Sequence, residues 1–471
     1  MKNYKIKIAL FSLGFATLLS CNKIKDFGAT NDNPNAITAV NTTAHLTNVL
    51  SGISGWATDN NAAVWIQYVS ESQYPGQGLY DVVTTYHGFG TYTGSLLNLK
   101  TIITKSTNPS EIAAARILTQ YIYMHLTDNL GDIPYSQALQ GTTPGYDTQE
   151  KIYKGMIAEL KAANAQFSGA LNGDILNNGS ITKWKKFANS LRAMMALQLS
   201  KKYPGTSEYA AIEFRAALLD GVIDNNADNI QLNYPGGSYQ NPFYLAHDGA
   251  RDDGESTQLY GMLNTLADGR QAAYGSSNIP IPHGISEAKV NLFTKNNINW
   301  SRTLADNQRT ATSPVYMLRA SQLFLARAEA AERLWTTEDK IAMYTQGINA
   351  SFAQWGLPLP SASYFAQAGV TLDGTNNMKK IAEQAYLSAF PDGSAGWNIW
   401  RRTGYPVLVN APDFLNPLHS TVPHRYTFIP FSASTFSEYS LNPAGVASSI
   451  ATLGANPTAG DLQENKVWWE K

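Results

Sequence analysis

Long stretches in which apolar residues recur every three or four positions constrain the fold of this 471-residue chain most strongly. Such spacing puts apolar side chains on one face of an α-helix. The clearest stretches begin at a Ser or Thr that can cap a helix. Amphipathic helices must bury these faces against one another, so the sequence predicts a mostly α-helical protein. The expected helices cover residues 110–128, 148–167, 181–203, 313–335 and 336–356.

The last two of these stretches adjoin with a tight joint, which predicts an antiparallel helix pair. Ala at close-approach positions and Tyr or Trp near the helix ends are typical of tetratricopeptide units, although a strict repeat of about 34 residues is not visible. Irregular segments rich in Gly, Pro, Asn and Tyr separate the helices, at residues 221–255, 270–312 and 404–441. Loops of this length in a compact protein are usually functional.

The start of the chain has the pattern of an export signal. Three lysines precede an apolar run, residues 8–20, which is shorter than the roughly 20 residues that span a bilayer. The run ends in LLSC, which resembles a bacterial lipobox and contains the single cysteine of the chain, Cys21. We expect residues 1–20 to be a lipoprotein signal peptide, Cys21 to be lipidated and residues 21–42 to be a tether before one domain, residues 43–471. The alternative is cleavage elsewhere, with Cys21 incidental.

Charge and cysteine content exclude several classes of protein. Lys and Arg total 35 against 36 Asp and Glu, so we expect no basic surface for nucleic acid or for anionic lipids. A mature chain with one cysteine can form no internal disulfide and no cysteine-based metal site.

No local pattern indicates catalysis, a metal or a cofactor. The sequence lacks G-x-S-x-G, H-E-x-x-H, Walker and G-x-G-x-x-G patterns, and its seven histidines stand at no metal-ligand spacing. Residues 224–229 start like a calcium loop but lack its glycine and its final glutamate, so we interpret them as a turn. The acidic run 251–255 suits a cation less well than a solvated loop with internal ion pairs. We therefore expect a protein that is not an enzyme and has no cofactor.

Several motifs, in order, resemble those of the SusD/RagB family of nutrient-binding outer-membrane lipoproteins. They are DNLGDIPYSQAL (128–139), YDTQEKIYKGMIAEL (146–160), WKKFANSLRAMMALQLS (184–200), LRASQLFLARAEAAERLW (318–335) and WNIWRRTGYP (397–406). The resemblance covers nearly the whole chain. Within it we interpret GDIPY as a stiff turn between two helices, in which Asp132 bonds nearby backbone N–H groups, and not as a ligand contact.

The resemblance implies a fold, a function and partners. The implied fold is an α-superhelix of tetratricopeptide-like helix pairs with a loop-rich ligand-binding half. The implied function is capture of an oligosaccharide, or in some members a peptide, and its delivery to a TonB-dependent, SusC-like outer-membrane barrel without bond-breaking. The implied location is the outer membrane, with a lipid anchor and facing the cell exterior. The alternative from the helical pattern is an adaptor that binds only a protein partner.

Aromatic side chains in the loops are the candidates for ligand contact. A flat ring matches the apolar face of a sugar, while Asn, Gln, Asp and Arg match its hydroxyl groups. Most aromatic rings in the chain are expected in the core, Trp65 and Tyr68 among them. The sparse Lys and Arg of the candidate loops favour a neutral glycan over a uronic acid. The candidates that stand beside Gly, Pro or Asn are Tyr74, Tyr80, Tyr239, Tyr244 and Trp300.

Overall fold

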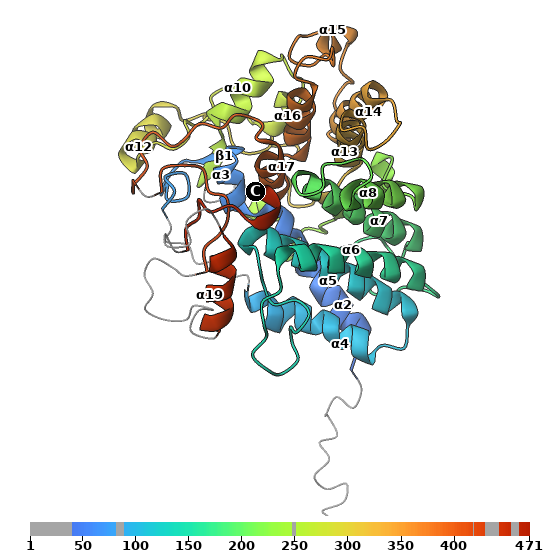
Figure 1. Ribbon diagram of the computed structural model, residues 1–471. Helices are drawn as coiled ribbons and strands as arrows, with labels where there is room; N and C mark the ends of the chain where they lie inside the picture. The colour runs from blue at the N-terminus through green and yellow to red at the C-terminus, as the bar shows by residue number, and fades with distance from the viewer. Residues whose placement is uncertain (1–39, 82–88, 247–250, 418, 429–441, 454–460) are drawn as a thin grey trace, which may run out of the picture. The chain divides into compact units, whose positions relative to one another are not determined.

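The computed structural model describes residues 40–81, 89–246, 251–417, 419–428, 442–453 and 461–471 (Figure 1). The predicted signal peptide, the lipidation site Cys21 and the tether as far as Ala39 lie outside the described residues. Thr42–Lys471 form one unit, to which everything below refers.

One group of helices packs in chain order, each against the next along the series, as the pairing of amphipathic stretches predicts. Figure 1 shows this group in blue to green. It consists of α2 (Thr42–Gly52), α4 (Leu97–Lys105), α5 (Pro109–Leu130), α6 (Gln149–Gln166), α7 (Ile181–Gln198) and α8 (Tyr209–Leu219).

A second group follows later in the chain. Within it α13 packs on both α14 and α16, and α17 packs on α16 and on α3, near the start of the unit. Contacts between α7 and α13 join the two groups. The group consists of α13 (Ala320–Glu332), α14 (Lys340–Gln354), α16 (Asn377–Ala389) and α17 (Gly393–Thr403), with α3 (Asn60–Trp65) against it.

The remaining segments are short. Two small antiparallel sheets pair β1 (Val69–Glu71) with β3 (Asp253–Glu255), and β2 (Ile230–Leu232) with β4 (Val315–Leu318). Among them lie the helices α9 (Pro242–Leu245), α10 (Thr257–Thr265), α11 (Gln271–Tyr274), α12 (Glu287–Asn296), α15 (Ala362–Phe365) and α19 (Pro443–Thr452). Single helical turns are η3 (Ile53–Thr58), η5 (Tyr92–Leu96), η6 (Leu199–Lys201), η7 (Asn226–Asp228) and η10 (Trp468–Glu470).

The structure confirms the mostly α-helical fold and corrects one predicted helix. Residues 315–318, predicted to open the helix at 313–335, form β4, and α13 begins only at Ala320. The run from Pro314 carries Val315 and Tyr316, residue types that favour strands, and β2 supplies the pairing edge. The tertiary partner therefore decides the conformation here. Within the described residues, no helix has both the length and the apolar character needed to cross a membrane.

The GDIPY motif is a structural turn, as expected. Gly131 ends α5 with φ +91°, a conformation that favours glycine. The buried Asp132 accepts a hydrogen bond from the N–H of Gln149, 2.7 Å away, and another from the hydroxyl of Thr452, 3.0 Å away. The motif therefore joins α5, α6 and α19.

Candidate functional site

The β1–β3 ribbon brings together loop segments that are far apart in the sequence. Val69 pairs with Glu255 and Glu71 with Asp253. The segment after α12 adds to the ribbon, because the N–H of Glu255 donates to the carbonyl oxygen of Ser301 at 3.0 Å. Two of the predicted contact residues, Tyr74 and Trp300, belong to these segments.

Tyr74 presents its ring to solvent just beyond β1. Its side chain is 71% exposed, and its φ of +53° is unusual for a bulky residue. Tyr74 lies three positions beyond the end of the ribbon at Glu71, about 10 Å at full extension. The turn is closed by the N–H of Gly76, which donates to the carbonyl oxygen of Tyr74 at 2.7 Å. The loop thus holds this aromatic ring outside the core.

Trp300 lies across β3. A Cβ atom at Gly254 would stand 2.7 Å from Cζ3 and 2.9 Å from Cε3 of the Trp300 ring, so the indole rests directly on the glycine backbone. The Trp300 side chain remains partly exposed. A flat, half-covered indole on a rigid strand suits stacking against the apolar face of a sugar.

Glu71 fastens the Tyr74 loop to the ribbon. Its carboxylate accepts hydrogen bonds from the N–H groups of Gly78 and Gln77, at 2.8 and 3.4 Å. Burial raises the pKa of Glu71 to about 7, although these two bonds act in the opposite direction. The conformation of the Tyr74 loop therefore depends on the largely buried carboxyl group of Glu71 and on its hydrogen bonds to the loop backbone.

Glu255 binds the segment that contains Trp300 through hydrogen bonds. It is fully buried and accepts hydrogen bonds from the hydroxyl of Ser301 at 2.7 Å and the amide of Gln271 at 2.9 Å, both on Oε2. Its Oε1 is buried and has no hydrogen-bond partner among the described residues. Burial raises the pKa of Glu255 to about 7, although its bonds from Ser301 and Gln271 act in the opposite direction.

Polar groups border the two rings. Gln73 donates from its amide to the carboxylate of Asp252, and the N–H of Ser72 donates to the Asp252 carbonyl oxygen at 2.7 Å. Within the described residues the guanidinium groups of Arg251 and Arg302 have no side-chain hydrogen bond and no ion pair, and both residues reach solvent. These donors and acceptors can meet sugar hydroxyls. We call the set of Tyr74, Trp300, Gln73, Asp252, Arg251 and Arg302 the ribbon surface.

Sequence reasoning missed one exposed ring near this surface. Phe414 is 39% exposed, and the next residue, Leu415, donates its N–H to the carbonyl oxygen of Leu79 in the Tyr74 loop at 3.3 Å. The only available signal was its place between two prolines in the irregular segment 404–441. The contact with the loop joins residues more than 330 positions apart, which no local pattern reveals.

The structure corrects the prediction for Tyr80. Its ring is 1% exposed, and its hydroxyl oxygen accepts a hydrogen bond from the N–H of Ala411 at 3.0 Å. Burial raises the pKa of Tyr80 to about 12. The neighbouring Gly and Pro residues, which suggested an exposed loop, instead form a turn that folds Tyr80 inward, so its ring offers no face to a ligand.

Tyr239 and Tyr244 lie apart from the ribbon pairing. The half-buried Tyr239 donates its hydroxyl to the carbonyl oxygen of Ser51, and its ring centroid is 4.9 Å from that of Tyr234. Tyr244 is half-buried in the short helix α9, where its N–H donates to the capping side chain of Asn241 at 3.1 Å. The Tyr239 ring therefore has structural contacts, and neither tyrosine is joined to β1 or β3 by a described hydrogen bond.

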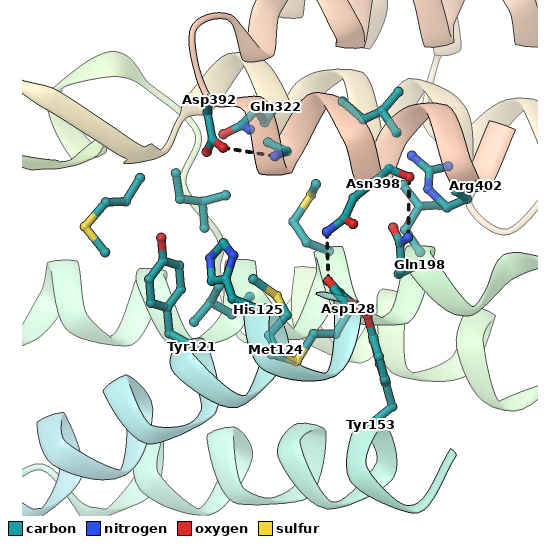
Figure 2. A pocket seen from close by; sticks show the side chains of 18 residues that line it. Tyr121, Met124, His125, Asp128, Tyr153, Gln198, Gln322, Asp392, Asn398 and Arg402 are labelled. Atoms are coloured by element: carbon teal, nitrogen blue, oxygen red, sulfur yellow. Dashed lines mark hydrogen bonds between the residues drawn. The ribbon is translucent and has the colours of Figure 1, made fainter. Parts of the chain in front are cut away.

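An internal cavity between the helix groups is lined by α5, α6, α7, α13 and α17 (Figure 2). It measures about 70 Å³. Tyr121 and His125 point into it, and each has a buried polar atom with no hydrogen-bond partner in the described part of the chain. On the other side Asn398 donates to Asp128 at 2.7 Å. The volume has room for a few waters but is far below the roughly 300 Å³ of small-molecule sites, so it is no sugar site.

A larger groove, about 520 Å³, lies beside the turn between α5 and α6. Its aromatic rings stack on one another: the Phe89 centroid is 5.4 Å from that of Tyr92 and 6.4 Å from that of Tyr146. Thr143 and Asn442 complete its polar rim. Because these ring faces are largely occupied by each other, we rank this groove second to the ribbon surface.

The two acidic runs do not form metal sites. Asp224 and Asp228 both accept from the ammonium of Lys186, at 2.8 and 2.6 Å, so a side-chain cation closes the turn, in line with the interpretation from sequence. The prediction of a solvated loop at 251–255 was wrong for its second half, which is the buried strand β3. Among the described residues, no group of three or more His, Cys, Asp or Glu is arranged to hold a metal ion.

Comparisons with known proteins bear on both fold and family. A family model described as SusD-like, starch-binding and associating with the outer membrane matches residues 34–429. No curated protein matches the chain.

Solved structures share the fold over most of the chain. A chitin-binding protein aligns with a TM-score of 0.77 at 24% identity, over 92% of this chain and 100% of its own. A chitin-binding SusD homolog from Flavobacterium johnsoniae aligns at 0.78 and 22%, over 91% and 98%. A SusD homolog from Bacteroides uniformis aligns at 0.78 and 22%, over 91% and 99%. Identities this low establish the fold and leave the ligand open.

Proposed function

The chain belongs to the SusD-like family of outer-membrane-associated binding proteins, and from this premise we propose that it captures an oligosaccharide on the ribbon surface and delivers it to a TonB-dependent, SusC-like barrel. Family membership confirms the expectation that the chain is not an enzyme, since the family binds its ligands. The ligand, the delivery step and the barrel are the proposal.

The ribbon surface carries the proposal. It joins an exposed ring, Tyr74, and a half-covered ring, Trp300, to Arg251 and Arg302, whose guanidinium groups have no partner in the described part of the chain. Aromatic faces with free polar donors around them are the combination that a sugar requires. Two of the similar structures carry chitin-binding in their names. This makes chito-oligosaccharides the first ligands to test, with malto-oligosaccharides second.

We further propose how the protein is held at the membrane. Residues 1–20 direct export, and the lipidated Cys21 anchors the mature chain in the outer membrane, facing the cell exterior. Several acyl chains on one cysteine give stable anchoring, whereas a single chain is marginal. Residues 21–42 act as the tether of the domain 43–471. Mass spectrometry of the mature N-terminal peptide tests this: an unmodified Cys21, or cleavage at another position, contradicts it.

Calorimetric titration of the full-length chain in detergent with a panel of chito-, malto- and uronate-containing oligosaccharides tests capture. We expect saturable heat with a neutral glycan. Trp300→Ala and Tyr74→Ala should each weaken binding by about tenfold or more, as truncation of a stacking aromatic anchor does. The exposed Leu359, 60% accessible and outside the ribbon surface, supplies the control Leu359→Ala, which should bind normally.

A further variant separates the two candidate surfaces. Thr143→Tyr fills the groove beside Tyr146 without removing a ring from it. Loss of binding in Thr143→Tyr together with normal binding in Trp300→Ala would move the site to that groove. An absence of heat with every glycan would reject oligosaccharide capture.

A further inference from the structure

The segment that follows α17 lies on the loop-rich side of the unit. Figure 1 shows its orange trace passing from α17 towards α12. The carboxylate of Asp413 fixes its far end, accepting from the N–H of Ser286 at 2.8 Å and from the ammonium of Lys289 at 2.6 Å. Between these points, Val407 and Val409 are 68% and 61% exposed.

Two glutamine side chains occupy one edge of this segment. The amide of Gln67 donates to the carbonyl oxygen of Val409 and accepts from its N–H at 3.3 Å. Gln258 donates to the carbonyl oxygen of Val407 at 3.2 Å. Main-chain groups two residues apart therefore point the same way, as they do in an extended strand.

The opposite edge is open. In an extended chain the N–H and C=O groups of alternate residues point in opposite directions, so Leu408 and Asn410 direct theirs away from the glutamines. Neither main chain has a hydrogen-bond partner in the described part of the protein. Pro406 and Pro412, which have no N–H, limit the open edge to residues 407–411.

The side chains alternate with the same period. Leu408 packs against the core, whereas Val407 and Val409 face solvent. A strand with an unpaired main chain and outward valines is a template for another extended chain. Its sequence, VLVNA, carries no charge, and the nearby Asp413 is neutralised by Lys289. An uncharged strand matches this edge, because a charged side chain packed against Val407 and Val409 would lose hydration without gaining a counter-ion.

We propose that residues 407–411 are a strand-addition site for an uncharged, extended segment of a partner protein, with apolar residues at alternate positions. The partner's main chain pairs with Leu408 and Asn410, and its side chains pack beside Val407 and Val409, a recognised mode of peptide binding. Only a few hydrogen bonds are available, so the isolated segment binds weakly, with Kd on the order of micromolar to millimolar. Avidity from further contacts strengthens such an interface in a full complex.

The site adjoins the ribbon surface without sharing its residues. Ala411 donates its N–H to Tyr80, and Leu415 donates to Leu79, both in the loop that carries Tyr74. A partner strand here would therefore lie near the loop that carries Tyr74. The strand-addition proposal does not depend on glycan binding, so an experiment can reject either proposal and leave the other standing.

A short designed peptide tests the edge directly. The probe is an acetylated and amidated pentapeptide of alternating Thr and Val, added to the full-length protein at millimolar concentration. Hydrogen exchange should slow at the N–H groups of Leu408 and Asn410. N-methylation of the probe residues that face this edge should remove the protection, while N-methylation of the alternate residues should preserve it. Equal binding of both methylated probes would overturn the proposal, as would no protection by the parent peptide.

Variants make the test specific to the site. Asn410→Pro removes one outward N–H and tolerates the extended Val409 before it, so probe affinity should fall about tenfold. Val407→Lys combined with Val409→Lys should also abolish binding by placing charges on the edge. Leu359→Lys, at another exposed leucine, is the matched control and should bind normally. Circular dichroism checks that each variant is folded.

Two other occupants give distinct results. If the probe binds in the ligand site, Trp300→Ala weakens it, and the proposal is overturned. If the edge pairs with a second copy of the chain, sedimentation shows a concentration-dependent dimer that Asn410→Pro dissociates, which also overturns it. Normal probe binding to Trp300→Ala, by a protein that sediments as a monomer, supports the proposal.

Discussion

At the scale of single residues, Gly254 shows how the absence of a side chain places a functional ring. A Cβ atom there would lie 2.3 Å from the carbonyl oxygen of Ser301 and 2.7 Å from Cζ3 of Trp300. A real Cβ atom does not approach other atoms this closely. A side chain at position 254 would therefore push the segment of Trp300 and Ser301 away from β3. Position 254 is therefore reserved for glycine by the indole above it and by the strand beside it.

We expect Gly254→Ala to displace Trp300 and so weaken glycan binding about as much as Trp300→Ala does, by about tenfold or more. The change touches no ligand, so tryptophan fluorescence should report a more exposed indole in the free protein. Gly261→Ala is the control, since a Cβ atom there meets nothing within 4 Å. Normal binding by Gly254→Ala would remove Trp300 from the proposed site.

The buried carboxyl of Glu255 predicts a pH dependence of stability. Burial raises its pKa from the ordinary 4.5 to about 7 in the folded protein, so the folded state holds a proton that the unfolded state releases. The stabilising effect is complete below pH 4.5 and is lost as the pH rises through 7. Glu255→Gln keeps an uncharged acceptor for Ser301. The free energy of unfolding of this variant should therefore fall less steeply between about pH 4.5 and 7. Urea denaturation at several pH values measures the free energy of unfolding. If Glu255→Gln has the same pH dependence as the unchanged protein, Glu255 is not the group responsible.

At the scale of secondary structure, local signals account for the helices. Asn108, Pro109 and the carboxylate of Glu111 mark the start of α5, and the cap on Thr148 marks the start of α6. The sequence predicted both helices to within two residues of their observed limits. The ribbon escaped prediction because β1 and β3 are three residues each and pair across more than 180 positions. Short strands of this kind acquire their conformation only from the partner.

The α5 cap gives a prediction at this scale. The Asn108 side chain accepts from the N–H of Ser110 at 2.9 Å and donates to the carbonyl oxygen of Ala170 at 2.9 Å. Asn108→Ala should lower the free energy of unfolding by about 1 kcal/mol. Asn108→Asp keeps the cap and loses only the bond to Ala170, so it should be milder. Urea denaturation measures the free energy of unfolding of both variants. If both lose the same amount, the loss comes from the bond to Ala170 and not from the cap.

The same reasoning explains the mixed outcome for the candidate site. The expectation that Tyr74 and Trp300 reach solvent came from composition, because Gly, Pro and Asn neighbours do indicate loops. The same neighbours misled for Tyr80, whose burial depends on Ala411, 331 positions away. Phe414 was missed for a related reason, since its exposure and its proximity to Leu79 are both set by the fold. Composition therefore locates loops, and tertiary contacts decide which of their rings are available.

At the scale of the whole molecule, the end of the described chain completes the core of the first helix group. Trp469 is fully buried, and its indole N–H donates to Asp128 of α5 at 3.0 Å. Asp128 also accepts from Tyr153 of α6 and Asn398 of α17, so four segments meet at one carboxylate. Burial raises the pKa of Asp128 to about 6 despite the nearby Arg401.

Removing this indole should affect both helix groups together. Trp469→Ala is expected to cost about 3–5 kcal/mol, the range for a buried Trp replaced by Ala. It also leaves an acceptor of Asp128 unused. Trp469→Phe keeps most of the volume and loses the N–H, so it separates packing from hydrogen bonding. Calorimetric melting of both variants measures the effect, and a change below about 1 kcal/mol in Trp469→Ala would contradict a role in the core.

The position of Trp469 also has a consequence for synthesis. A ribosome makes this chain from residue 1, so the segments that surround Trp469 exist before Trp469 itself is made. Here α5 is made early, yet the space that the Trp469 indole occupies beside Asp128 stays empty until residue 469 has been made. A chain that stops short of that residue keeps an open interior that proteases can reach. Cells would therefore degrade incomplete copies, and the copies that persist would be those translated through residue 469.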